Sequence, residues 1–186
     1  MDQGLLISLG ELTKTFRAIH AISLRSLKKP QYSRLFLTNE KNMKNFRLLF
    51  VTNNYPPKIG GMEQYCFDLY GNLRKHLAID KISNSRSRNF IPFFAIYAFI
   101  KGLVKNKQYS AFHFGGGVLA PVGALLKALT GKKIYVTVHG LDITWPNKFY
   151  QNIIFPSLKR ADKVICVSNY TKKLCLERGL EKNKII

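Results

Sequence analysis

Short apolar runs alternate with longer amphipathic segments along most of the chain. The runs are five to seven residues long and rich in β-branched and aromatic residues, which is typical of strands buried on both faces of a parallel sheet. They lie at 46–52, 109–114, 133–138 and 163–167. The segments between them repeat apolar residues every three or four positions, which predicts helices. These lie at 62–77, 90–107, 119–130, 149–160 and 169–178.

Residues that start and end helices stand where this pattern needs them. Pro121 falls in the first turn of the third predicted helix, and Gly131 follows its last residue. Ser168 is a suitable N-cap for the last helix, which Gly179 would close. Strands that alternate with helices require crossover connections. The sequence therefore predicts an α/β fold, a Rossmann-like and mostly parallel sheet with helices on both faces.

The pattern is weaker in two places. Residues 1–42 carry scattered lysines and arginines, an amphipathic pattern and few turn signals. We predict a basic N-terminal extension there, which need not be ordered, outside a folded domain at 43–186. The segment 79–89, which reads IDKISNSRSRN, allows at most one short strand.

The composition adds a strong positive charge. The 186 residues include 30 lysines and arginines against 10 aspartates and glutamates, which gives a formal net charge of +20. Such a surface attracts nucleic acid, anionic lipid or a phosphorylated substrate. No helix-turn-helix, zinc finger or RNP-like pattern is recognisable in the sequence, so nucleic acid is the least favoured partner.

Cysteine usage and hydropathy set further limits. The three cysteines, Cys66, Cys166 and Cys175, show no CxxC spacing, so we expect a reducing cytoplasm. The longest uncharged apolar stretch, 90–100, is shorter than the ~18 residues of a membrane-spanning helix, so we expect no membrane crossing. The segment 90–107 combines an apolar face with lysines. Two interpretations of it stay open, a helix packed on the core and a helix lying on an anionic membrane.

Three polar or glycine-rich turns are predicted to meet at one edge of the sheet. Ligands of open α/β sheets bind beyond the carboxyl ends of the strands. The turns at 53–63, 115–117 and 139–145 all follow predicted strands. We therefore expect the binding site at this edge.

The first of these turns carries a glycine pair ahead of a helix. Gly60 and Gly61 would let backbone N–H groups at the helix N-terminus approach an anion, and Lys58 would add a positive charge. The alternative is that the two glycines only make a tight turn, since no complete phosphate-binding motif is present. Glu63 in the first helical turn suits the helix dipole and is expected to be structural.

A histidine and an aspartate follow the strand at 133–138. His139 can donate to a substrate oxygen, and Asp142 can orient it or accept a hydroxyl proton. The alternative for both is a hydrogen-bonded pair within the loop. His113 lies inside a predicted strand and is expected to be a core residue. A metal site built from these three residues has no ligand spacing to support it.

Four segments together resemble the N-terminal domain of family-4 glycosyltransferases, which are retaining enzymes of the GT-B fold. They read RLLFVTNNYPPKIGGMEQY, HFGGGVLAPVGALLKAL, KKIYVTVHGLDITWPNKFYQ and ADKVICVSNYTKKLCLERG. They occur in this order between Met43 and Ile186, at spacing appropriate to the family. The resemblance implies one half of a two-domain enzyme. In such an enzyme a nucleotide-diphosphate sugar binds mainly to the C-terminal half and the acceptor to the N-terminal half.

For individual residues, the resemblance implies roles at the cleft between the two halves. Gly60 and Gly61, flanked by Lys58, match the loop that faces the diphosphate and sugar of the donor. His139 matches the histidine near the transferred sugar, and Asp142 lies in the same loop, so both are candidate catalytic residues. The family needs no metal and no cofactor, because the nucleotide sugar is a co-substrate.

The resemblance also implies a function for the whole chain. The sequence stops about where the family begins the linker to its donor-binding domain, so that domain is expected to be absent and this half to be inactive alone. The expected reaction is hexosyl transfer to a glycan or a lipid-linked acceptor, in the cytoplasm and peripherally at an anionic membrane face. A separate donor-domain chain is a further expected partner. The alternative is a basic peripheral module that binds membranes or a partner without catalysis.

Overall fold

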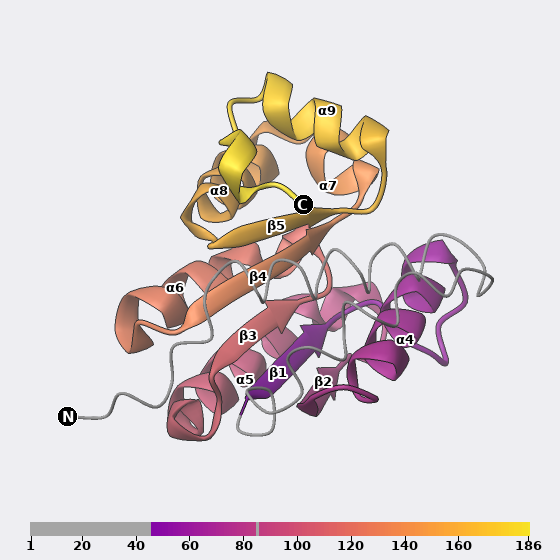
Figure 1. Ribbon diagram of the computed structural model, residues 1–186. Helices are drawn as coiled ribbons and strands as arrows, with labels where there is room; N and C mark the ends of the chain where they lie inside the picture. The colour runs from indigo at the N-terminus through magenta and orange to yellow at the C-terminus, as the bar shows by residue number, and fades with distance from the viewer. Residues whose placement is uncertain (1–45, 85) are drawn as a thin grey trace, which may run out of the picture.

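The computed structural model describes residues 46–84 and 86–186. Within these ranges, five strands form one sheet in the order β2-β1-β3-β4-β5, with every neighbouring pair parallel (Figure 1). The strands are β1 Arg47–Thr52, β2 Ala78–Ser83, β3 Ala111–Phe114, β4 Lys133–Val138 and β5 Lys163–Cys166. The prediction of a Rossmann-like parallel sheet is therefore confirmed. The extension predicted at 1–42 lies outside the described residues.

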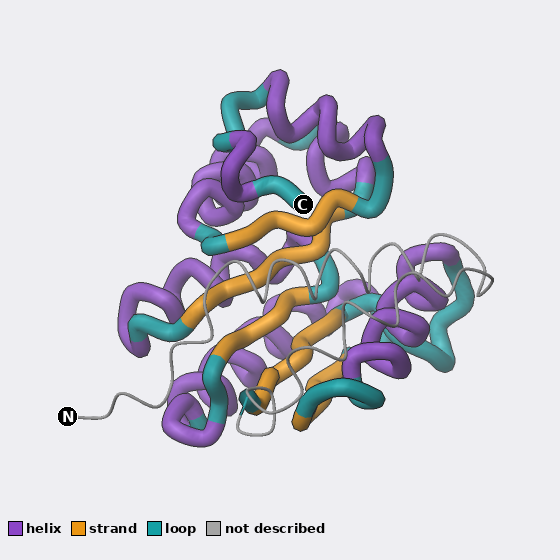
Figure 2. The backbone as a smooth tube through the Cα atoms, viewed as in Figure 1, coloured by secondary structure: helices purple, strands orange, loops and turns teal. Residues whose placement is uncertain are grey.

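Helices connect the successive strands, as Figure 2 shows. They are α4 Gly61–Leu73, α5 Ile91–Val104, α6 Ala120–Thr130, α7 Gly140–Thr144, α8 Lys148–Arg160 and α9 Asn169–Glu177. The helices predicted from the apolar spacing are present, although α4 ends earlier than the predicted residue 77. The prediction of a turn at 139–145 was wrong in part, because a short helix, α7, begins immediately after His139.

The segment that was predicted to hold at most one short strand contains β2. Its six residues pair with β1 in parallel, beginning with Ala78 opposite Arg47. Because β2 is an edge strand with no buried side chain, it lacks the continuous apolar run of the central strands. Asp80 anchors this edge, since its carboxylate lies 2.9 Å from the Arg47 guanidinium and accepts a hydrogen bond from the Tyr109 hydroxyl at 2.8 Å.

Apolar side chains fill the space on both faces of the sheet. Successive residues of a strand point to opposite faces, and β1 shows this directly. Leu48 and Phe50 pack in one cluster with Leu69 of α4, whereas Leu49 and Val51 pack in a second cluster with residues of α5, α6 and α8. The sheet therefore has α4 on one face and α5, α6 and α8 on the other.

Two glycines allow α6 to lie close to its neighbours. A Cβ atom on Gly123 would lie 2.9 Å from side-chain carbons of both Ile134 and Phe114, so the helix axis can approach β3 and β4 only without a side chain here. A Cβ atom on Gly102 of α5 would lie 2.8 Å from the Leu126 side chain. The close packing of α5, α6 and the sheet depends on both positions.

A pair of glycine substitutions tests this packing. We expect Gly123→Ala to lower the free energy of unfolding by about 1–3 kcal/mol, because the added methyl group overpacks the core. Gly71→Ala is the matched control, since a Cβ there meets no atom within 4 Å, and we expect it to raise stability by about 0.5–1 kcal/mol through helix propensity. Urea unfolding of both variants gives the comparison, and equal effects would contradict the close approach of α6.

Candidate functional site

The loops that follow the strands gather at the carboxyl edge of the sheet. The strand order has a switch point between β1 and β3, because the chain leaves β1 toward β2 and then crosses back to β3. The loops after two such strands diverge, and open α/β sheets bind ligands in the crevice between them. The turns predicted at 53–63, 115–117 and 139–145 all lie at this edge.

Three consecutive glycines fit the loop after β3 between its neighbours. A Cβ atom on Gly115 would lie 2.9 Å from the Thr52 side chain, and one on Gly116 would lie 3.1 Å from the Asn53 amide oxygen. On the other side, a Cβ atom on Gly117 would lie 2.8 Å from Cβ and Cγ of Asp142. The glycine triplet is therefore needed for close packing of this loop against those after β1 and β4.

Asp142 ties the loops after β3 and β4 together. Its Oδ2 atom accepts hydrogen bonds from the backbone N–H of Gly117 at 3.0 Å and from the backbone N–H of His139 at 2.9 Å. Its Oδ1 atom lies 3.4 Å from the Tyr150 hydroxyl, which donates to it. The bond to His139 is one half of a capping box, and it explains why α7 begins here instead of a simple turn. These contacts support a structural role, and direct catalysis by Asp142 stays a prediction.

His139 presents a buried ring nitrogen to the same edge. The residue is 7% exposed, and its ring packs edge-on against Tyr65 with centroids 5.6 Å apart. Within the described part of the chain, Nε2 has no hydrogen-bond partner. The pKa of His139 is lowered by burial, against opposing effects of Asp142, a hydrogen bond to the Gly115 backbone and Glu63. The imidazole is therefore neutral at neutral pH.

The contacts of the His139 side chain leave Nε2 as the ring nitrogen without a partner among the described residues. The ring is hydrogen-bonded to the Gly115 backbone, and the side chain also belongs to the capping box at the start of α7. In a neutral imidazole one nitrogen donates and the other accepts, so Nε2 can take either role toward a ligand. Donation from His139 to a substrate oxygen stays a prediction.

Two asparagines that the sequence analysis did not single out belong to the same edge. Asn53 follows β1 and is 7% exposed, and Asn84 follows β2 and is 4% exposed. The Oδ1 atom of Asn53 and the Nδ2 atom of Asn84 have no partner among the described residues. Together with Nε2 of His139, they place unpartnered polar atoms after three of the five strands. The sequence signal was only that each asparagine follows a strand.

The backbone conformation does not require glycine at either position of the pair at the start of α4. Gly60 has φ 164° and ψ 166°, an extended conformation that any residue adopts, and a Cβ atom on Gly61 would meet nothing within 4 Å. A Cβ atom on Gly60 would collide with the Glu63 carboxylate. The ammonium of Lys58 donates to the Asn53 carbonyl at 3.0 Å, and burial lowers the pKa of Lys58. Lys58 is therefore a cation fixed at this edge, beside the end of β1.

Glu63 lies closer to the candidate site than its position in the sequence indicates. It is 9% exposed, and its charge acts on both Lys58 and His139, raising the pKa of each against the effect of burial. A carboxylate in the first turn of α4 also competes with any external anion for the helix N-terminus. The residues around Gly60 and around His139 thus belong to one electrostatic neighbourhood.

His113 is a core residue, as predicted. It is fully buried, its Nε2 lies 2.9 Å from the Thr137 hydroxyl, and its ring meets Phe50 edge-on at 5.1 Å. Its ring nitrogen is thus engaged inside the sheet and separate from His139. Among the described residues, no group of three or more histidines, cysteines or acidic residues is arranged to hold a metal ion.

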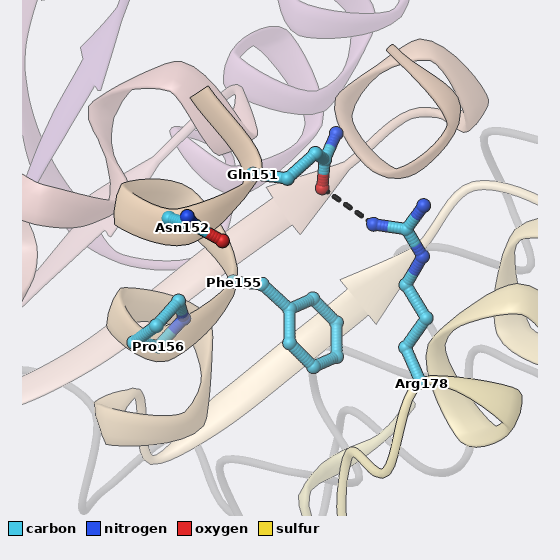
Figure 3. A pocket seen from close by; sticks show the side chains of 5 residues that line it. All are labelled: Gln151, Asn152, Phe155, Pro156 and Arg178. Atoms are coloured by element: carbon cyan, nitrogen blue, oxygen red, sulfur yellow. Dashed lines mark hydrogen bonds between the residues drawn. The ribbon is translucent and has the colours of Figure 1, made fainter. Parts of the chain in front are cut away.

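A separate pocket of about 380 Å³ lies between α8 and α9 (Figure 3). Its lining residues are Gln151, Asn152, Phe155, Pro156 and Arg178. The Arg178 guanidinium donates a hydrogen bond of 2.6 Å to the Gln151 side chain across the pocket. The positive charge of Arg178 therefore already has a partner within the pocket. It contains none of the predicted site residues. The buried, unpartnered atoms lie at the strand edge instead, and that edge is the candidate site.

The five parallel strands and their helices define a Rossmann-like α/β domain, and the polar carboxyl edge of the sheet is its candidate ligand site. The family model for Glycosyltransferase Family 4 matches residues 74–186, more than half of the chain. The chain belongs to glycosyltransferase family 4, which confirms the resemblance at the level of the family. His139 and Asp142 lie inside the matched range, whereas Lys58, Gly60 and Gly61 precede it. No curated protein sequence matches the chain.

Removal of the Asp142 carboxylate should destabilise the domain. We expect Asp142→Ala to lower the free energy of unfolding by about 2–3 kcal/mol, because two backbone N–H groups lose their charged acceptor. Asp68→Ala is the control, since Asp68 bonds an exposed glutamine side chain, and its effect should stay below about 0.5 kcal/mol. Equal effects in denaturant unfolding would show that Asp142 does not join the loops.

The buried His113 predicts a specific acid dependence of stability. Burial lowers its pKa from 6.5 to about 3, so between these pH values the unfolded chain binds a proton that the folded protein does not. Stability should therefore fall as the pH falls through this window, by about 1.4 kcal/mol per pH unit from this residue. Urea unfolding at a series of pH values gives the slope of the unfolding free energy against pH. In this acid range His113→Gln should reduce that slope by the contribution of one proton. An unchanged slope would mean that His113 is protonated in the folded state.

Proposed function

We propose that this chain forms the acceptor-side, N-terminal half of a GT-B glycosyltransferase. In this proposal the enzyme transfers a hexosyl group from a nucleotide-diphosphate sugar to a glycan or a lipid-linked acceptor, with retention of configuration and without a metal. Membership of glycosyltransferase family 4 supports sugar transfer in general. The polar edge of the sheet supports the position of the sugar.

The observation that carries the proposal is the unpartnered Nε2 atom of His139. A buried polar atom normally has a hydrogen-bond partner. A buried atom without one at the carboxyl edge of the sheet therefore indicates a position that a ligand or a water molecule fills. Because the imidazole is neutral, Nε2 either donates or accepts a hydrogen bond, according to the tautomer. A sugar hydroxyl is a matching partner in both cases, since it can donate and accept.

The two asparagines extend the same chemistry along the edge. Asn53 presents an amide oxygen, which accepts hydrogen bonds, and Asn84 presents an amide nitrogen, which donates them. Hydroxyl groups do both, so a polyhydroxylated ligand can satisfy all three positions. In the proposed reaction these residues hold the sugars in the reactive geometry, and orientation of this kind is a large part of catalysis.

Positive charge near the loop after β1 suits the diphosphate of the donor. Lys58 and Arg88 are near enough that the charge of Arg88 helps to lower the pKa of Lys58, after burial. We place the diphosphate against this pair and the backbone of Gly60 and Gly61. Fixed positive charge there would stabilise the negative charge that develops on the leaving nucleotide.

The donor nucleotide itself is proposed to bind mainly in a second Rossmann-like half, carried by another domain or another chain. The described residues contain one sheet, and its carboxyl edge would form one wall of the cleft. This half is proposed to turn over no substrate by itself. We place it in the cytoplasm, with the acceptor presented at an anionic membrane face.

A second candidate function is membrane binding without catalysis. The observation that favours it is the row of exposed apolar side chains on α5, which a purely catalytic half does not need. Sugar transfer and membrane binding are compatible in one protein. The assay below separates them, because it measures transfer alone.

Release of nucleoside diphosphate from activated sugars tests the proposal, with the chain assayed alone and together with a separately expressed donor-binding half. We expect no release above background alone and turnover in the reconstituted pair. His139→Ala should lower kcat/KM of the pair by about 10- to 100-fold, because one hydrogen bond to the sugar is lost.

His76→Ala is the matched control for this substitution. His76 is exposed and follows α4 at the opposite end from the candidate edge, so its replacement should leave kcat/KM unchanged. Full activity of the His139→Ala pair would remove His139 from the reaction. Turnover by the chain alone would contradict the need for a second half.

A further inference from the structure

Helix α5 is apolar on all sides, and only part of it faces the core. Phe94, Ala98 and Gly102 are buried against the sheet and α6. On the opposite side, apolar residues recur at a spacing of three and four and stay exposed, from Phe93 at 71% to Val104 at 75%. The residues of this outer row are Phe93, Ile96, Tyr97, Ile100 and Val104. The buried side confirms the interpretation of segment 90–107 as a helix packed on the core, and the exposed side leaves the membrane interpretation a prediction.

Helix α6 adds two exposed leucines beside the outer row of α5. Leu125 and Leu129 are 54% and 62% exposed. Lys127 bonds the Arg160 carbonyl at the end of α8, so it marks the side of α6 that faces α8. At 3.6 residues per turn, the two leucines lie about 160–200° from Lys127 around the helix, on the side next to α5. Gly102 brings the two helices close together there.

We define the α5–α6 apolar face as this row together with the two leucines. Its members are Phe93, Ile96, Tyr97, Ile100, Val104, Leu125 and Leu129. The two helices lie on the side of the sheet away from α4 (Figure 1). Single exposed apolar residues are ordinary on protein surfaces, but seven of them on two helices that pack together indicate an interaction site.

The charged residues at the two ends of α5 are all basic. From Arg86 to Lys107 the sequence has five lysines and arginines and no acidic residue. Lys101, Lys105 and Lys107 lie at the C-terminal end of α5 or just beyond it. At the N-terminal end, the Arg86 guanidinium stacks over the Phe90 ring at 5.1 Å. A second copy of this chain would bring like charges together, whereas an anionic bilayer would attract every one of them.

We propose that the α5–α6 apolar face docks on an anionic lipid bilayer, with its apolar side chains in the interfacial region and its lysines and arginines among the headgroups. Each such cation near an anionic surface adds electrostatic attraction to the gain from apolar burial. No helix of the described residues is both long enough and apolar enough to cross a bilayer, so the helices lie along the surface.

Docking of this face would also place the candidate site close to the bilayer. Asn84 follows β2 at the site, and Arg88 lies three residues before the start of α5. The N-terminal end of α5 is therefore at the carboxyl edge of the sheet, beside the proposed sugar position. A sugar carried on a membrane lipid would reach that edge directly. This deepens the membrane part of the proposed function and does not depend on catalysis.

Vesicle flotation of the whole chain tests the proposal without any sugar present. The protein should float with phosphatidylcholine vesicles that contain phosphatidylglycerol, and much less with phosphatidylcholine alone. Ile96→Glu with Ile100→Glu should weaken binding by at least about 10-fold, because two inserted side chains become anionic. The control is Tyr170→Glu with Leu176→Glu on α9, which makes the same charge change at exposed apolar residues and should weaken binding far less.

A fluorescence measurement reports contact with lipid directly. Trp145 is the single tryptophan of the sequence, so Trp145→Phe combined with Phe93→Trp places one reporter on the face. Brominated lipids should quench this reporter and should leave a Trp145→Phe, Phe67→Trp control on α4 unquenched. Thermal unfolding by circular dichroism checks that each variant folds.

Three results would overturn the proposal. They are no flotation of the wild type, equal loss of binding in the two glutamate pairs, and self-association in lipid-free buffer that Ile96→Glu with Ile100→Glu abolishes. The last result would assign the face to a contact between copies of the chain. A protein that binds vesicles through this face but transfers no sugar after reconstitution would refute the sugar-transfer proposal alone.

Discussion

The carboxylate of Asp142 joins the loops at the candidate site, and the geometry there depends on it. It accepts backbone hydrogen bonds from Gly117 after β3 and from His139 after β4. These bonds start α7, set the backbone of His139 and leave its side chain directed to the edge of the sheet. The position of the imidazole thus follows from a backbone constraint, and its neutral state follows from burial. A residue predicted as catalytic has, in this structure, a clear positioning role.

Much of the fold follows from the apolar pattern, because central strands and core-facing helices bury their side chains. The runs that became β1, β3, β4 and β5 were continuous and apolar, and the helix caps at Ser168 and Gly131 lie where they were expected. Ser168 accepts from the Thr171 backbone, and Gly131 has the positive φ of 66° that favours glycine. The edge strand β2 was poorly defined in the sequence, since water can satisfy an exposed edge and no continuous apolar run is needed.

The candidate site was predictable only in part, for a physical reason. A histidine after a strand is visible in the sequence, but the absence of a partner for Nε2 is a property of three-dimensional packing. The same holds for Asn53 and Asn84, whose unpartnered atoms no motif records. The α5–α6 apolar face shows the converse, because periodicity alone cannot say which side of an entirely apolar helix stays exposed. Its exposure, together with the lysines and arginines at the two ends of α5, is the basis of the proposed membrane contact.

The most direct test of the account is the protonation of His139, measured by nitrogen-15 NMR of histidine-labelled protein. The His139→Gln variant assigns its signals. The account predicts a neutral ring at neutral pH and a pKa below the ordinary 6.5 because of burial. A pKa at or above 6.5 would contradict the claim that this edge of the sheet presents a buried, neutral imidazole to a sugar hydroxyl.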